Sequence, residues 1–158
     1  MSSLPLLYRD QVRSAWVDYN GHMRDAYYLL LFSHASDALI DAIGLDEAGR
    51  ARSGHSVYTV EVHLNYLQEL KQGAELRVEW RLLGHDAKRL HIMLLLYRGE
   101  ESQPAALCEQ MLLHVDTRQG RSTPFAAGVA TRIAAMAAEQ ASLPLPEHGR
   151  HIALPVLP

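Results

Sequence analysis

The sequence is poor in several features that mark particular classes of protein. It has one cysteine, Cys108, so it forms no internal disulfide, and we expect a reducing compartment, the cytoplasm. Acidic residues outnumber basic ones, 18 to 15, and no Lys/Arg cluster offsets the net charge of −3, which argues against nucleic-acid binding. We find neither the pattern of a secretion signal nor an apolar run that approaches a membrane span. These absences predict a cytoplasmic protein that binds neither nucleic acid nor membrane.

The chain is long and apolar enough to bury a core of its own. Its 158 residues are 48% hydrophobic and 21% charged, the balance of a single globular domain. We assign residues 1–142 to this domain. Residues 143–158 contain four prolines and are predicted to form an extended tail.

A long apolar segment over residues 25–43 has the periodicity of a helix. Its apolar stripe consists of Tyr28, Leu31, Phe32, Ala35, Leu39 and Ala42. Apolar residues also lie outside this stripe near the start, so we expect other structure to surround the helix there. Gly44 is predicted to end the helix.

The pattern then changes to the two-residue alternation of strands. Over residues 56–66, one face is predicted to carry Tyr58, Val60, Val62, Leu64 and Tyr66. Similar alternation follows over residues 75–82, 90–96 and 105–115, and a short strand-like segment covers residues 6–14. We predict that the four later strands form an antiparallel meander and that a small surface helix covers residues 125–140.

Together these elements predict an α+β fold. An antiparallel five-stranded sheet with one apolar face would wrap around the one long helix. The other face is predicted to be polar, and either solvated or used in an assembly. It carries Thr59, Glu61, His63, Arg77 and Arg81.

Three polar residues, Asp18, Asn20 and His22, come just before the long helix. The unpaired N–H groups of a helix start favour a carboxylate nearby and can also stabilise an oxyanion. This arrangement suits hydrolysis of an acyl derivative, with Asp18 as base or nucleophile, Asn20 orienting water or the carbonyl, and His22 assisting proton transfer. The alternative is structural, because Asp and Asn are ordinary caps before a helix and Gly21 serves turns.

The order of elements, with an Asp-containing loop before the helix, resembles the hotdog fold of the 4-hydroxybenzoyl-CoA thioesterase-like family. The resemblance implies that Asp18 is the catalytic carboxylate and that a backbone N–H near Asp25 is the oxyanion donor. Asp18, Asn20 and His22 also look like the catalytic loop of plant-type acyl-carrier-protein thioesterases. Four separated blocks, over residues 16–23, 58–63, 84–91 and 109–116, are similar to the betainyl-CoA thioesterases of carnitine degradation.

This resemblance implies an acyl-CoA substrate, no cofactor, and a homodimer with the active site between subunits, or two such dimers in a homotetramer. The betainyl group ends in a trimethylammonium cation, which aromatic ring faces bind by cation–π contact. Trp16 and Tyr19 border the Asp18 loop and are the first candidates. The other candidates are Tyr27 and Tyr28 on the helix, and Tyr58 and Tyr66 on the following strand. Rings at helical spacing are more commonly core residues.

Two other pairs have both a functional and a structural interpretation. Glu61 and His63 share one strand face and are candidates for substrate binding, or else are solvated or face another subunit. Lys88 and Arg89 follow a predicted turn, where they could bind a CoA phosphate, although exposed Lys and Arg are common. The nine histidines form no His-Glu-x-x-His motif, and we predict no metal site.

Two other functions stay open from the sequence. A hotdog enoyl-CoA hydratase would also use Asp and His, but its loop looks like Asp-x-Asn-Pro-x-His. The loop here has no proline, and Asp18 and His22 are one position closer. The second alternative is a non-enzymatic acyl-CoA-binding protein whose polar face serves only assembly.

Overall fold

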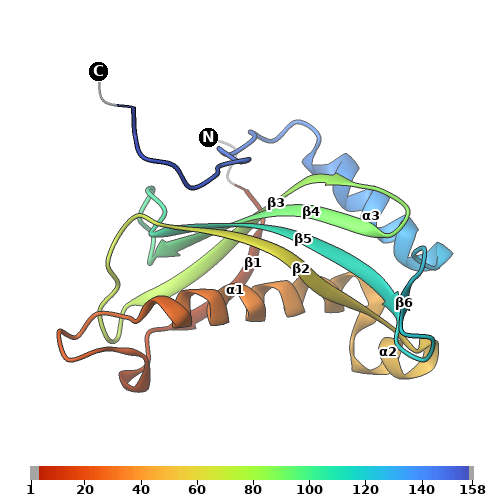
Figure 1. Ribbon diagram of the computed structural model, residues 1–158, viewed down its shortest axis with the longest axis horizontal. Helices are drawn as coiled ribbons and strands as arrows, with labels where there is room; N and C mark the ends of the chain where they lie inside the picture. The colour runs from red at the N-terminus through yellow and green to blue at the C-terminus, as the bar shows by residue number, and fades with distance from the viewer. Residues whose placement is uncertain (1–3, 157–158) are drawn as a thin grey trace.

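One long helix lies along the inner face of a curved antiparallel sheet (Figure 1). The computed structural model describes residues 4–156, so the first three residues of the predicted domain and the last two of the tail lie outside it. The strands are β1 (Leu6–Gln11), β2 (His55–Tyr66), β3 (Glu75–His85), β4 (Arg89–Arg98), β5 (Ala106–Asp116) and β6 (Arg121–Ser122). The helices are α1 (Asp25–Ile40), α2 (Glu47–Ser53) and α3 (Ala127–Gln140), with short turns at Ser14–Trp16 and Asp41–Leu45.

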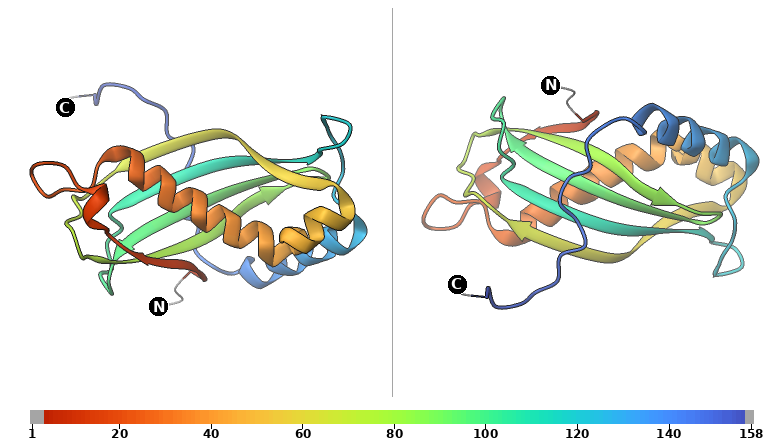
Figure 2. Two further views of the ribbon diagram at one scale, coloured as in Figure 1. Left: turned by 90° about the horizontal axis from the view of Figure 1, so that it is seen from below. Right: turned by 90° about the horizontal axis from the view of Figure 1, so that it is seen from above.

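The sheet order is β1-β3-β4-β5-β2, with β6 paired to β5. The predicted meander is wrong at one step, because β2 pairs with β5 whereas β3 pairs with β1 and β4. Residues 67–74 therefore carry the chain from the edge strand β2 across to β3, which lies next to the opposite edge strand β1, past the start of α1 (Figure 2). Alternation within a strand indicates which face is buried, but not which strand lies beside it.

The core lies between α1 and the inner face of the sheet. The predicted stripe of α1 is buried, with exposures of 0–4% for Tyr28, Leu31, Phe32, Ala35 and Leu39. Ala42 was predicted to extend this stripe, but it is exposed because the helix widens into the turn at Asp41–Leu45. Gly44 ends the helix with φ +98°, a conformation that other residues rarely adopt.

The helical stretch Asp25–Leu45 contains an 18-residue window with a mean hydropathy of 1.3, which by length and composition would allow it to cross a membrane. The expectation that no run approaches a membrane span is therefore wrong for this stretch. Half of its apolar window is buried inside the protein. Packing against the sheet accounts for its apolar character.

The alternation of β2 changes phase in the middle of the strand. The pairing of β2 with β5 skips Val60, which is the extra residue of a β-bulge. One inserted residue turns the side chains on its two sides to opposite faces. Tyr58, predicted to share a face with Val62 and Leu64, therefore lies on the outer face beside Leu113, so that prediction is wrong for Tyr58.

The outer face, away from α1, is only partly polar, which corrects the prediction. A second apolar cluster, 3–8% exposed, consists of Met93, Leu95 and Tyr97. Arg81 is 7% exposed, and its guanidinium donates to the carbonyl of Leu82 and to Gln140 of α3. The C-terminal tail crosses this face (Figure 2), and the N–H of Gly149 donates to Glu109 Oε2 at 2.6 Å.

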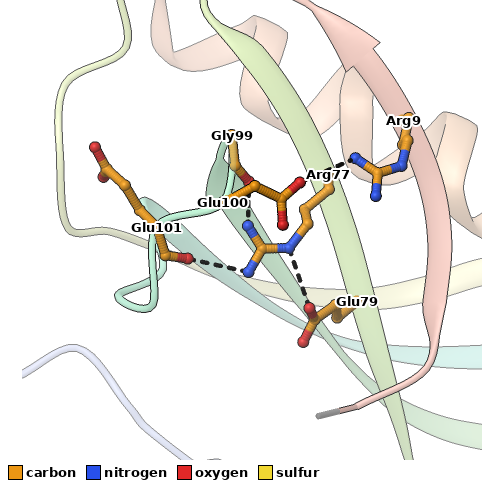
Figure 3. A network of polar contacts seen from close by, with 6 residues as sticks. All are labelled: Arg9, Arg77, Glu79, Gly99, Glu100 and Glu101. Carbon is orange, nitrogen blue, oxygen red and sulfur yellow. Dashed lines mark hydrogen bonds and ion pairs between the residues drawn. The ribbon is translucent and has the colours of Figure 1, made fainter.

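Arg77 on β3 holds the loop between β4 and β5 against the outer face (Figure 3). Its guanidinium donates to Glu79 Oε1 at 3.1 Å. It also donates to two carbonyl oxygens of that loop, those of Gly99 and Glu101. Arg9 on β1 forms an ion pair with Glu100 of the same loop at 3.7 Å. A planar guanidinium suits several acceptors at once, and these contacts fix the end of the sheet beside β1.

The buried position of His114 predicts that the folded protein loses stability in mild acid. Its side chain is fully buried, with Nδ1 2.7 Å from the carbonyl oxygen of Thr123 and the ring packed edge-on against His55. Burial lowers the pKa of His114, the Thr123 carbonyl opposes this, and His55 adds to the lowering. The unfolded chain binds a proton near pH 6.5, where folded His114 resists one, so the free energy of unfolding falls as pH drops below about 6.5.

We expect His114→Gln to weaken this pH dependence, because glutamine can still donate toward Thr123 but does not titrate. The difference in the free energy of unfolding between neutral and acidic pH should shrink by about 1.4 kcal/mol for each unit of difference between the folded and unfolded pKa that the substitution removes. Urea unfolding at pH 7 and pH 5 measures it. His151→Gln at an exposed position is the matched control and should behave as the parent. An unaltered difference between the two pH values in His114→Gln would contradict the assignment.

Candidate active site

The loop before α1 is a closed turn, at one end of the molecule (Figure 1). Val17 and Met23 form an antiparallel bridge across it, and Gly21 has φ +75°, which the turn requires. The N–H of Arg24 donates to the carbonyl of Trp16 at 2.9 Å, joining the base of the loop to the start of the helix. Asp18, Asn20 and His22 are thus held in one rigid turn.

Asp18 is fixed by the backbone of this loop. Its Oδ1 accepts the N–H groups of Asn20 at 2.8 Å and of His22 at 3.2 Å. Desolvation acts to raise the pKa of Asp18, but these N–H groups, together with positive charge on His22 and Arg24, outweigh it and leave the pKa below its usual value. Asp18 is therefore ionised at neutral pH. Its Oδ2 has no hydrogen-bond partner within residues 4–156 and can face a ligand.

The loop is docked onto the segment between β2 and β3. The backbone of His22 pairs with that of Lys71 in an isolated antiparallel β-bridge, and the N–H of Met23 donates to the carbonyl of Leu70 at 2.7 Å. His22 Nε2 lies 3.2 Å from Glu69 Oε2. Sequence reasoning missed Glu69, because it lies in a connection without periodicity and is brought to His22 only by this docking.

The start of α1 leaves a backbone donor free. No side chain caps the helix, and Arg24 at the cap position is extended. The N–H of Ala26 is taken by Asp25 Oδ1 at 2.9 Å, whereas the N–H of Asp25 donates to no group within the described chain. Together with the helix dipole, this N–H is suited to a developing negative charge.

A cavity of about 280 Å³ opens beside this helix start. It is lined by Met23, Asp25, Tyr28, Tyr66, Leu67, Gln68 and Glu69. These residues come from the Asp18 loop, the first turn of α1, the end of β2 and the segment that follows β2. The loop that carries the ionised carboxylate of Asp18 and the free backbone N–H of Asp25 therefore lie next to a small cavity.

The aromatic candidates of the loop occupy different environments. Trp16 is only 6% exposed, stacks on Tyr27 with ring centroids 5.7 Å apart, and lies under the guanidinium of Arg13 at 4.9 Å. It offers little ring area to a ligand. Tyr19 is 93% exposed at the tip of the loop.

The other candidate residues lie away from the helix start in this chain. Glu61 and His63 line a separate cavity of about 300 Å³ on the outer face, together with His91 and Glu109. Lys88 and Arg89 lie in the hairpin between β3 and β4, at the opposite end of the sheet (Figure 1). There they contact Ser122 and Asp86, respectively.

Comparison with known proteins gives this arrangement a family. Residues 12–133 match the family described as "Thioesterase-like superfamily". The chain belongs to the thioesterase-like superfamily. The predicted hotdog fold and thioesterase class are thereby confirmed, and the protein is a hydrolase of thioester bonds.

Individual relatives match nearly the whole chain. A betainyl-CoA thioesterase of Pseudomonas aeruginosa is 53% identical over 156 residues, covering 98% of both chains. An L-carnitine dehydrogenase/betainyl-CoA thioesterase of Rhizobium meliloti is 43% identical over 143 residues, which are 90% of this chain but 29% of that protein. A Staphylococcus aureus protein solved in complex with CoA is 30% identical, with a TM-score of 0.89 over 98% of this chain and 99% of that one.

Proposed function

We propose that this thioesterase hydrolyses betainyl-CoA to betaine and CoA in the breakdown of carnitine. The similarity to a betainyl-CoA thioesterase along nearly the whole chain supports this substrate. A relative that joins such a domain to an L-carnitine dehydrogenase supports the metabolic setting. The structural observation that carries the proposal is the ionised Asp18 in a loop that is tied to a helix start with a free N–H.

In this mechanism Asp18 acts on the thioester carbonyl, either directly or through water. As a base, it takes a proton from water while the hydroxyl adds to the carbonyl carbon. The N–H of Asp25 stabilises the oxyanion that forms. The C–S bond then breaks and the thiolate of CoA leaves and gains a proton, with His22 as the nearby acid. As a nucleophile, Asp18 would instead form an anhydride that water hydrolyses.

We further propose that two copies join through β2. One side of this strand pairs with β5, and its other side is an open edge of the sheet that residues 4–156 form. Exposed apolar side chains line it, which is unusual for an unprotected edge. They are Tyr58 (53% exposed), Val60 (53%), Val62 (39%) and Tyr66 (47%). Because Tyr66 also lines the cavity beside α1, a partner at this edge would close the active site.

The CoA moiety and the cellular location complete the proposal. Arg24 and Lys71 are exposed beside the Asp18 loop and are suited to the CoA phosphates. We place the reaction in the cytoplasm. The sequence has one cysteine, Cys108, which supports a reducing compartment because it cannot form a disulfide within the chain.

Initial rates across a small panel of acyl-CoA thioesters test this function. Release of free CoA, followed with a thiol reagent, should be fastest with betainyl-CoA. A hydratase would instead remove the absorbance of an enoyl-CoA without releasing thiol, and a binding protein would do neither. Turnover of other thioesters without turnover of betainyl-CoA would keep the enzyme class and reject the substrate.

A further inference from the structure

The cavity beside α1 is walled by two tyrosine rings in a fixed arrangement. Tyr28 and Tyr66 meet edge to face, with ring centroids 5.0 Å apart and an interplanar angle of 83°. The hydroxyl of Tyr28 donates to the carbonyl of Gln68 at 3.0 Å, and that of Tyr66 to the carbonyl of Asp25 at 3.1 Å. Both hydroxyls are thus bound to the backbone. The ring of Tyr66, 47% exposed, remains to meet a ligand, whereas Tyr28 is 4% exposed and supports that ring from beneath.

The charged groups of this wall have one sign. Asp25 and Glu69 contribute carboxylates, and the lining contains no Lys or Arg. Burial raises the pKa of both tyrosines, and the carboxylates add to it, Glu69 for Tyr28 and Asp25 for Tyr66. The rings are therefore neutral at pH 7 beside two anions. Ring faces together with carboxylates are the combination that binds a cation unable to donate hydrogen bonds.

We propose that this cavity is a subsite for a quaternary ammonium group, with Tyr66 and Glu69 as the residues that select it and Tyr28 as the buried ring that holds Tyr66 in place. The proposal rests on the proposed function and names the part of the site that recognises the acyl group. At about 280 Å³ the cavity lies at the lower end of ligand-pocket volumes, which suits a small head group.

The position of the cavity agrees with the chemistry of a betainyl thioester. A single methylene separates its ammonium nitrogen from the carbonyl carbon. The cation subsite must therefore adjoin the group that stabilises the oxyanion. Asp25 meets this requirement, because it lines the cavity and also carries the free N–H of the helix start. Trp16 is too deeply buried for this role, and Tyr19 is almost fully exposed to solvent.

The test compares betainyl-CoA with 3,3-dimethylbutyryl-CoA, which has the same shape without the charge. The measured quantity is the ratio of kcat/KM for the charged over the neutral thioester. Tyr66→Leu should lower this ratio about tenfold, the scale of one cation–π contact. Glu69→Gln should lower it about threefold, because the Glu69 side chain is 74% exposed and its charge is screened.

Two matched variants separate recognition from folding. Tyr66→Phe keeps the ring and should keep the ratio within about twofold, since a phenylalanine face also binds cations. Glu139→Gln neutralises an exposed carboxylate on α3 and should leave both rates at the parent values. Equal ratios in the parent, Tyr66→Leu and Glu69→Gln would overturn the proposal.

A second measurement distinguishes failure of the subsite from failure of the proposed function. Thioether analogues, in which a methylene replaces the thioester carbonyl, bind without turnover. Calorimetry should show tighter binding of the ammonium analogue than of its neutral counterpart, and Tyr66→Leu should abolish the difference. That result supports the subsite even if betainyl-CoA is not hydrolysed. If the parent protein binds both analogues with equal affinity, the subsite is rejected, even if betainyl-CoA is hydrolysed.

Discussion

Asp18→Asn is expected to lower kcat on betainyl-CoA at least ~100-fold, the usual contribution of a catalytic carboxylate. Asparagine can still accept the N–H groups of Asn20 and His22, so the loop should keep its shape. What the variant loses is the negative charge and the unpaired oxygen. Thiol release under saturating substrate measures the effect, and circular dichroism checks the fold.

Glu139→Gln is again the control, because it removes a carboxylate that is exposed on α3 and remote from the loop. Its kcat should equal that of the parent. Near-normal turnover of Asp18→Asn would move the chemistry to another residue. Since the pKa of Asp18 is lowered, its ionised form should persist below the usual carboxyl range, and activity that depends on it should decline only at a pH lower than that at which an ordinary aspartate titrates.

The same residue allows the two mechanisms to be separated. In a single turnover in ¹⁸O-labelled water, a base mechanism places the label in betaine at once. A nucleophile mechanism in which water attacks the Asp18 carbonyl of the anhydride transfers an unlabelled Asp18 oxygen to betaine and leaves the label in the protein. Mass spectrometry of the peptide that contains Asp18 distinguishes the two results.

The elements themselves were predictable wherever burial repeats with a regular period. The stripe of α1 from Tyr28 to Leu39 is buried as expected, and Gly44 ends the helix. The bulge at Val60 escaped prediction, because an inserted residue leaves each half of the alternation intact and changes only their relative phase. The pairing of β2 with β5 escaped for a similar reason, since it depends on a crossover between distant segments.

The candidate site was predictable to the extent that it lies in one short segment. The motif places Asp18 and His22 in a loop before a helix, and the structure joins that loop to the helix start. Glu69 and Tyr66 belong to a different segment and adjoin the loop only after folding. Trp16 shows the opposite case, because position in the sequence suggested a ligand contact whereas packing buries its ring.

Val60→Asp is expected to convert a dimer into monomers and to reduce kcat/KM at least tenfold. Val60 is the bulge residue of β2 and is 53% exposed, so a single chain tolerates the carboxylate. In a two-fold interface the substitution enters twice, and a carboxylate buried among apolar side chains without a partner is strongly unfavourable. Sedimentation at micromolar concentration reports the mass, and Ile152→Asp, at a 95% exposed apolar residue of the tail, should change neither mass nor rate. A parent that sediments as a monomer would contradict the interface, and a monomeric Val60→Asp with full activity would contradict an active site shared between subunits.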